Sequence, residues 1–148
     1  MEESCFQYQA DSETIKCSKN CKGGKRRKIN NFCVLSGEDA IKRDILKNGP
    51  VIVSMTIYVD FLTYKSGIFK SNEYSTKFSN THAVKIVGWG KDGKKNSLNK
   101  YWIIQNSWGE DWGENGFARV LIGQDLNIDK FAYSVDVEYK NKQEKKIN

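Results

Sequence analysis

One helix is predicted from the spacing of apolar residues in the first third of the chain. Four apolar residues recur at helical intervals and would form one face, namely Ala40, Ile41, Ile45 and Leu46. Ser36 precedes this face as a candidate N-cap, with Asp39 three positions later at the spacing of a capping box. Gly49 and Pro50 end the pattern, so we expect the helix to lie between Ser36 and Gly49.

Short strands are predicted for most of the remaining chain. The β-branched run "VIVSMTI" at 51–57 follows Gly-Pro and indicates a buried strand. Further strands are predicted at 82–90, 101–106, 117–122 and 131–139, with an aromatic turn or short helix at 58–69 and a charged hairpin connection at 91–100. This pattern predicts an α+β fold, in which an antiparallel barrel-like sheet carries one packed helix.

The two ends of the chain lack this periodicity. Residues 1–35 are rich in Cys and Lys and indicate an irregular loop held by cross-links, whereas 140–148 indicate a basic disordered tail. Residues 36–139 then form one domain, which suits a chain of 148 residues. The polar, acidic start is not typical of a signal peptide, and no run approaches the about 20 apolar residues of a membrane span.

Charge adds little to the functional interpretation. Lys and Arg number 24 against 18 Asp and Glu, and much of the net charge of +6 lies in 22–28 and 140–146. Such runs can bind polyanions such as heparin, but no aromatic residues are interspersed with them. A solvated loop and tail is therefore the favoured interpretation, and nucleic-acid binding is disfavoured.

All four cysteines fall within the first 33 residues, at Cys5, Cys17, Cys21 and Cys33. None forms a CxxC pair and the single His is remote, so neither a zinc site nor a cofactor is expected. Cysteines crowded into a short segment favour disulfides and an oxidising compartment.

Candidate chemistry lies in two segments of the second half. His82 opens the apolar stretch "HAVKIVGWG", and "NSWGEDWGENGF" at 106–117 places Asn106, two Trp and three Gly in one loop. Trp is costly to expose in a loop, so this loop is expected to hold a fixed shape. A core or surface His and an aromatic plug at the end of the sheet are the structural alternatives.

Together these segments resemble the C-terminal half of the papain family of cysteine peptidases, and cathepsin B-like members in particular. The resemblance runs from residue 17 to about 135 through "CSKNC" at 17–21, "KNGPV" at 47–51, "YVDFLTYKSGIF" at 58–69, "HAVKIVGWG" at 82–90, "YWIIQNSWGEDWGENGFARV" at 101–120 and "GQD" at 123–125. It implies the His/Asn lobe of the papain fold, with a peptide or protein as substrate. It also implies a cystatin-type inhibitor as a possible partner, and a lysosome-like or food-vacuole-like compartment or secretion.

The resemblance also implies roles for four residues. His82 matches the catalytic base, Asn106 the residue that orients its imidazole, and Trp108 the ring that shields their hydrogen bond from water. Trp112 matches a second Trp of the same loop. The single His leaves no counterpart in this segment for the His-bearing exopeptidase loop of cathepsin B-like enzymes.

The nucleophile has no convincing match. In this family the catalytic Cys precedes the His and Asn by about 130–150 residues, whereas Cys5 lies only 77 positions before His82. The resemblance therefore implies that Cys5, Cys17 and Cys21 are framework cysteines and that Cys33 is a free, partly buried thiol. We expect a half-site that needs a missing N-terminal lobe for activity. The alternative is a non-catalytic, peptidase-derived protein that binds a peptide, an inhibitor or a partner lobe.

Two short segments depart from the family pattern. Asn80 and Thr81 stand where cathepsin B-like enzymes usually have Gly-Gly, and they add side chains beside His82. After "GQD" the chain has Leu-Asn-Ile at 126–128 instead of Cys-Gly-Ile. The floor of the main specificity pocket would fall near residues 129–131, and no preferred substrate side chain is assigned.

Overall fold

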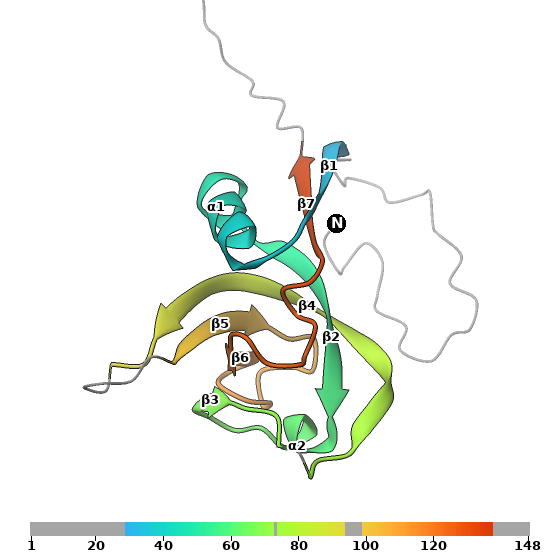
Figure 1. The fold of residues 1–148 in the computed structure, drawn as a ribbon, viewed down its shortest axis with the longest axis vertical. Helices are drawn as coiled ribbons and strands as arrows, with labels where there is room; N and C mark the ends of the chain where they lie inside the picture. The colour runs from blue at the N-terminus through green and yellow to red at the C-terminus, as the bar shows by residue number, and fades with distance from the viewer. Residues whose placement is uncertain (1–28, 73, 94–98, 138–148) are drawn as a thin grey trace, which may run out of the picture. The chain divides into compact units, whose positions relative to one another are not determined.

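The computed structural model describes residues 29–72, 74–93 and 99–137 (Figure 1). In chain order its elements are β1 (Ile29–Leu35), α1 (Glu38–Asn48), β2 (Val51–Tyr58), α2 (Val59–Leu62), β3 (Ile68–Phe69), β4 (Lys77–Lys91), β5 (Lys100–Gln105), β6 (Phe117–Leu121) and β7 (Ala132–Val137). Neither described helix is long and apolar enough to cross a membrane.

The strands form one seven-stranded sheet in the order β1-β7-β2-β4-β5-β6-β3. Strands β7, β2, β4, β5 and β6 pair antiparallel in that order, whereas the two-residue β3 runs parallel to β6. The predicted α+β fold with an antiparallel sheet is confirmed. The order is that of an open sheet, in which the long, curved β4 runs across the middle (Figure 1).

Alternate positions of the central strands form the core. Val51, Val53 and Met55 of β2 are buried, and so are Val84 and Ile86 of β4. Beyond Ile86 the pairing of β4 with β5 shifts by one residue, so that Ile86 faces Ile104 and Trp89 faces Trp102 across the two strands. This β-bulge explains why the apolar stretch from 82 to 90 does not alternate strictly.

Helix α1 packs against β2 and β4 through Ile41, which is fully buried. The helix ends where the sequence predicted, because the Gly49 N–H caps the carbonyl of Ile45. Its start differs from the prediction: the N-cap is Gly37 and no side chain caps the helix, so Ser36 has no capping role. Leu46 was also expected on the buried face, but it is 77% exposed.

The predicted irregular segment 1–35 is wrong at its C-terminal end, because 29–35 form β1. This strand is an edge strand beside β7, a partner about 100 residues away that no local pattern reveals. Cys33 lies on β1 as a free thiol, but it is exposed and not partly buried. Residues 1–28 and 138–148, with the three other cysteines and the basic tail, lie outside the described residues.

Other boundaries differ in smaller ways. Strand β4 begins at Lys77 and not at residue 82, while the segment 58–69 contains the short helix α2 followed by β3. Strand β7 is described from Ala132 to Val137, within the predicted range 131–139. The extension of β4 places His82 inside a strand rather than at its start.

Candidate active site

His82 lies on the core-facing side of β4, where it is half-buried at the end of the apolar row that includes Val84 and Ile86. It faces Met55 of β2, which is fully buried, across the strand pair. Its main chain is thus fixed by pairing, and only the ring needs a further contact to set its orientation.

Asn106 supplies that contact from the residue that follows β5. His82 Nε2 lies 2.8 Å from Asn106 Oδ1, and the Ser107 N–H donates to the same atom at 2.8 Å. An atom that accepts from a backbone N–H must be the amide oxygen, so His82 Nε2 is the donor in the neutral ring. Nδ1 then carries the lone pair and is the nitrogen available for proton transfer.

Trp108 lies against the imidazole that makes this hydrogen bond. Its ring stacks on the His82 imidazole with centroids 4.8 Å apart and an interplanar angle of 26°. The other ring contacts of Trp108 are T-shaped, with Phe61 at 5.9 Å and with Trp112 at 5.2 Å. A hydrogen bond beneath an aromatic ring competes less with water and therefore orients the imidazole better.

Trp112 is a buried residue of the hydrophobic core. It is 8% exposed, and its Nε1–H donates to the Leu62 carbonyl at 3.1 Å. The following Gly113 has a φ of 62°, and a Cβ there would lie 2.5 Å from the Phe117 carbonyl oxygen. The loop thus needs glycine at 113 both for the backbone angle and for the space. The same loop supports Trp108 through the buried Trp112.

Glu114 and Arg119 form an ion pair that the sequence did not single out. Arg119 Nε donates to Glu114 Oε2 at 3.0 Å, and the Gly67 N–H donates to Glu114 Oε1 at 3.0 Å. The hydrogen bonds from Arg119 hold the pKa of the Glu114 carboxyl below its usual range. Tyr64 lies beside the pair, and burial raises the pKa of its phenol. Nothing in the sequence could have paired Glu114 with Gly67, because the contact spans 47 residues.

Cys33 is excluded from the site by its place in the sheet. Strand β1 is three positions from β4, about 14 Å at the usual strand spacing. It is the only cysteine among the described residues, which therefore hold no thiol beside His82. In the same part of the chain no group of three or more His, Cys, Asp and Glu side chains could hold a metal ion.

The departures at 126–128 are accommodated locally. Leu126 is fully buried, and its carbonyl accepts a hydrogen bond from the Thr56 N–H at 2.8 Å. Asn127 has a φ of 56°, a left-handed conformation that Gly adopts freely and that Asn tolerates better than most residues. Its Nδ2 also donates to Thr56 Oγ1 at 3.2 Å. Beside His82, Thr81 is exposed.

The chain also matches a known family. The model of the family described as "Papain family cysteine protease" matches residues 1–136. The chain belongs to the papain family of cysteine proteases. This membership agrees with the resemblance found in the sequence and includes residues beyond those that the structure describes.

Three relatives illustrate the similarity, one of which has a cathepsin B-like name. The chain is 40% identical over 120 residues to "Cathepsin B-like cysteine proteinase 3" of Ostertagia ostertagi, covering 76% of this chain and 66% of that protein. It is 36% identical over 123 residues to "Gut-specific cysteine proteinase" of Caenorhabditis elegans, covering 78% and 36%. A third relative, "Tubulointerstitial nephritis antigen" of Bos taurus, is 46% identical over 99 residues, covering 62% and 21%.

A solved structure shows the same fold. "proCathepsin B S9 from Trypanosoma congolense" superposes with a TM-score of 0.76 at 28% identity, covering 93% of this chain and 48% of that one. The chain therefore spans about half of this solved protein and between 21% and 66% of the three relatives named above.

Proposed function

We propose that this chain supplies the histidine–asparagine half of a cysteine peptidase active site. The observation that carries the proposal is the 2.8 Å contact from His82 Nε2 to Asn106 Oδ1 beneath the ring of Trp108. It sets the imidazole with Nδ1 free to exchange a proton with a thiol. On this proposal, residues 36–139 form the His/Asn lobe and 1–35 join it to a second lobe, with 140–148 as a tail.

The chemistry follows from the free nitrogen. His82 Nδ1 takes the proton of a cysteine thiol, and the thiolate attacks the carbonyl carbon of a peptide bond. The imidazolium then returns that proton from Nδ1 to the leaving amine as the C–N bond breaks, which leaves an acyl thioester. Water hydrolyses the thioester with His82 again as the base. Asn106 accepts from Nε2–H throughout and keeps the ring in the working orientation.

The thiol is proposed to come from an N-terminal lobe that carries the catalytic Cys and the oxyanion donors. Two observations support this. Cys33 is three strands away from β4, and the chain spans only 48% of the cathepsin B structure that it matches. Without such a lobe the described residues hold a base and an orienting group but no thiol beside them, so we expect the chain to be inactive alone.

The relatives support the remaining parts of the proposal. Their names describe cysteine proteinases, one of them gut-specific, which favours a peptide or protein substrate. We place the protein in a lysosome-like or food-vacuole-like compartment or outside the cell. A cystatin-type inhibitor is a candidate partner through the resemblance to cathepsin B-like peptidases.

The test is reconstitution of the complete site. The N-terminal lobe of a cathepsin B-like relative is fused upstream of residues 1–148, and hydrolysis of a fluorogenic peptide is measured. The His82→Ala variant is expected to lower kcat by about 10²–10⁴-fold, the usual contribution of general acid–base catalysis. Lys47→Ala removes an exposed side chain at the end of α1 and serves as the control. Equal activity of the fusion and its His82→Ala variant would reject the assignment of the base.

A second candidate function is a non-catalytic binding protein derived from a peptidase. It is favoured by the bovine relative, which is 46% identical over 99 residues and is named as an antigen and not as a proteinase. In the reconstitution, a folded fusion that captures an immobilised cystatin but neither cleaves peptides nor reacts with a thiol-directed epoxide would select this function.

A further inference from the structure

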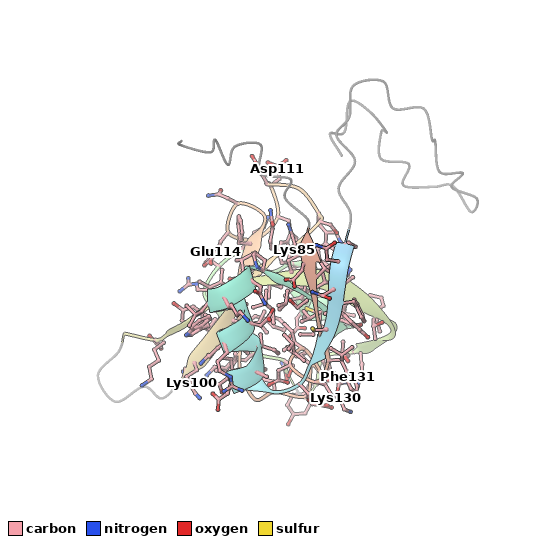
Figure 2. All side chains as sticks on the ribbon, turned by 90° about the horizontal axis from the view of Figure 1, so that it is seen from above. Lys85, Lys100, Asp111, Glu114, Lys130 and Phe131 are labelled. Carbon is pink, nitrogen blue, oxygen red and sulfur yellow. The ribbon has the colours of Figure 1, made fainter. Side chains whose placement is uncertain are left out.

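Glu114 connects three segments that are distant in the chain. It belongs to the loop between β5 and β6, accepts from Gly67 in the turn before β3, and pairs with Arg119 of β6. Glu114 is labelled in Figure 2, which draws the side chains around it. Its side chain is 27% exposed, so these charge-assisted bonds are partly shielded from water. The carboxylate is therefore a fixed anchor for the loop and not a freely solvated group.

Gly67 is held on both of its polar atoms. Its N–H donates to Glu114, and its carbonyl accepts from the Tyr64 hydroxyl at 2.6 Å. The same hydroxyl accepts from the Arg119 N–H at 3.3 Å, which connects the turn to β6 a second time. The Tyr64 ring packs on Trp112 with centroids 5.5 Å apart. Loss of the Glu114 carboxylate would thus loosen the surface against which Trp112 rests.

The anchor reaches the catalytic pair through the loop itself. Glu114 and Phe117 exchange two backbone hydrogen bonds, and the Gly116 carbonyl accepts from the Asn106 N–H at 2.9 Å. Trp112 in turn contacts Trp108, whose ring lies on His82. The loop backbone therefore fixes the main chain of Asn106, and the contact of Trp112 with Trp108 fixes the ring that stacks on His82.

We propose that Glu114 is a positioning residue that fixes the His82 imidazole by anchoring the Trp108–Trp112 loop to Gly67 and Arg119. Its importance for catalysis rests on the proposed function, whereas the orientation of the ring can be measured in the protein as it is. The backbone at Asn115 and at Gly113 has positive φ, at 53° and 62°. Such a turn needs support from outside itself, and the Glu114 anchor provides it.

The test is the ¹⁵N NMR signature of the His82 ring in residues 1–148. In the unmodified protein the two ring nitrogens should show one dominant tautomer, with the proton on Nε2 and slow exchange of that proton with water. In Glu114→Ala we expect the tautomers to mix and the exchange of the Nε2 proton to become about tenfold faster or more, as follows from loss of charge-assisted bonds. Glu114→Gln keeps an oxygen for Gly67 and should show a smaller change.

Glu38→Ala is the matched control. Glu38 also binds two basic groups, Lys42 and Lys100, and its side chain is 23% exposed, close to the value for Glu114. Its loss should lower stability to a similar extent and leave the His82 signals unchanged. If Glu114→Ala and Glu114→Gln perturb the ring no more than Glu38→Ala does, Glu114 has no positioning role. If the ring responds selectively but the two-lobed fusion cleaves no peptide, the proposed function fails and the positioning role stands.

Discussion

Gly113 offers the sharpest quantitative test of how the Trp108–Trp112 loop is built. An alanine there would adopt a φ of 62°, and its Cβ would lie 2.5 Å from the Phe117 carbonyl oxygen. That oxygen already accepts from the Glu114 N–H at 2.9 Å, so it cannot shift without breaking this bond. Gly109 of the same loop has a φ of 85°, but a Cβ added there would meet no atom within 4 Å. The two glycines therefore both need a positive φ, but only Gly113 lacks room for a Cβ.

The expected magnitudes follow from this difference. A left-handed conformation destabilises an alanine by about 1–2 kcal/mol, which applies to both Gly109→Ala and Gly113→Ala. A forced contact in a packed region adds about 1–3 kcal/mol, and it applies to Gly113→Ala alone. Since the same substitution has the same effect on the unfolded chain, the difference between the variants isolates the steric part.

The assay is urea unfolding of residues 1–148 and of both variants, followed by tryptophan fluorescence. With a slope of about 1–3 kcal/mol per molar urea for small proteins, Gly113→Ala should unfold roughly 1 M earlier than Gly109→Ala. The slopes should stay equal, because the unfolded states are the same. Equal midpoints for the two variants would refute the argument that the loop is closed against the Phe117 carbonyl.

Three further predictions concern the site, acid sensitivity and the core. Asn106→Ala removes the acceptor of the His82 Nε2–H bond, so the imidazole should show mixed tautomers by ¹⁵N NMR. The free energy of unfolding should fall by about 1 kcal/mol. A single tautomer in this variant would contradict the assignment of Asn106 as the residue that orients His82. Glu38 and Glu114 have pKa values below the ordinary 4.5, mainly through hydrogen bonds from lysine and arginine side chains. Because the folded pKa of each carboxyl is depressed, its stabilisation is complete above the unfolded pKa and is lost as pH falls below about 4.5. The urea midpoint of the unmodified protein should therefore drop between about pH 5 and pH 3, and that of a Glu38→Ala variant should drop less. Parallel pH profiles of the two proteins would exclude a contribution of Glu38 to acid sensitivity. Ile41→Ala, at a fully buried position of α1, should lower the free energy of unfolding by about 2–5 kcal/mol. Leu46→Ala, at a position that is 77% exposed, should lower it by less than about 0.5 kcal/mol. Similar unfolding midpoints for the two variants would show that the helix packs differently.

Parts of the fold that rest on local pattern were predicted well. Helix α1 and strands β2, β5 and β6 follow from apolar spacing and from punctuation by Gly and Pro, which act within a few residues. The start of α1 was mispredicted because Ser36 has the right chemistry for a cap, while the observed cap is Gly37, whose N–H donates to the Asp129 carbonyl. A contact across 92 residues overrode the local preference.

The candidate site divides in the same way. His82, Asn106, Trp108 and Trp112 were found because the linear motif carries them, and the structure brings all four into one cluster. Glu114 stands in the same motif, but its partner Gly67 lies 47 positions earlier, and no local pattern indicates that contact.

The sequence by itself determined the family, the positions of the main strands and the side chains that can perform the chemistry, because motif and periodicity are properties of neighbouring residues. Only the tertiary structure decided that β1 is a strand, that Cys33 is exposed and three strands from His82, and which imidazole nitrogen faces Asn106. Each of these depends on backbone pairing or side-chain contact between distant segments. Such contacts are selected by the packing of the whole sheet, which no stretch of sequence encodes alone.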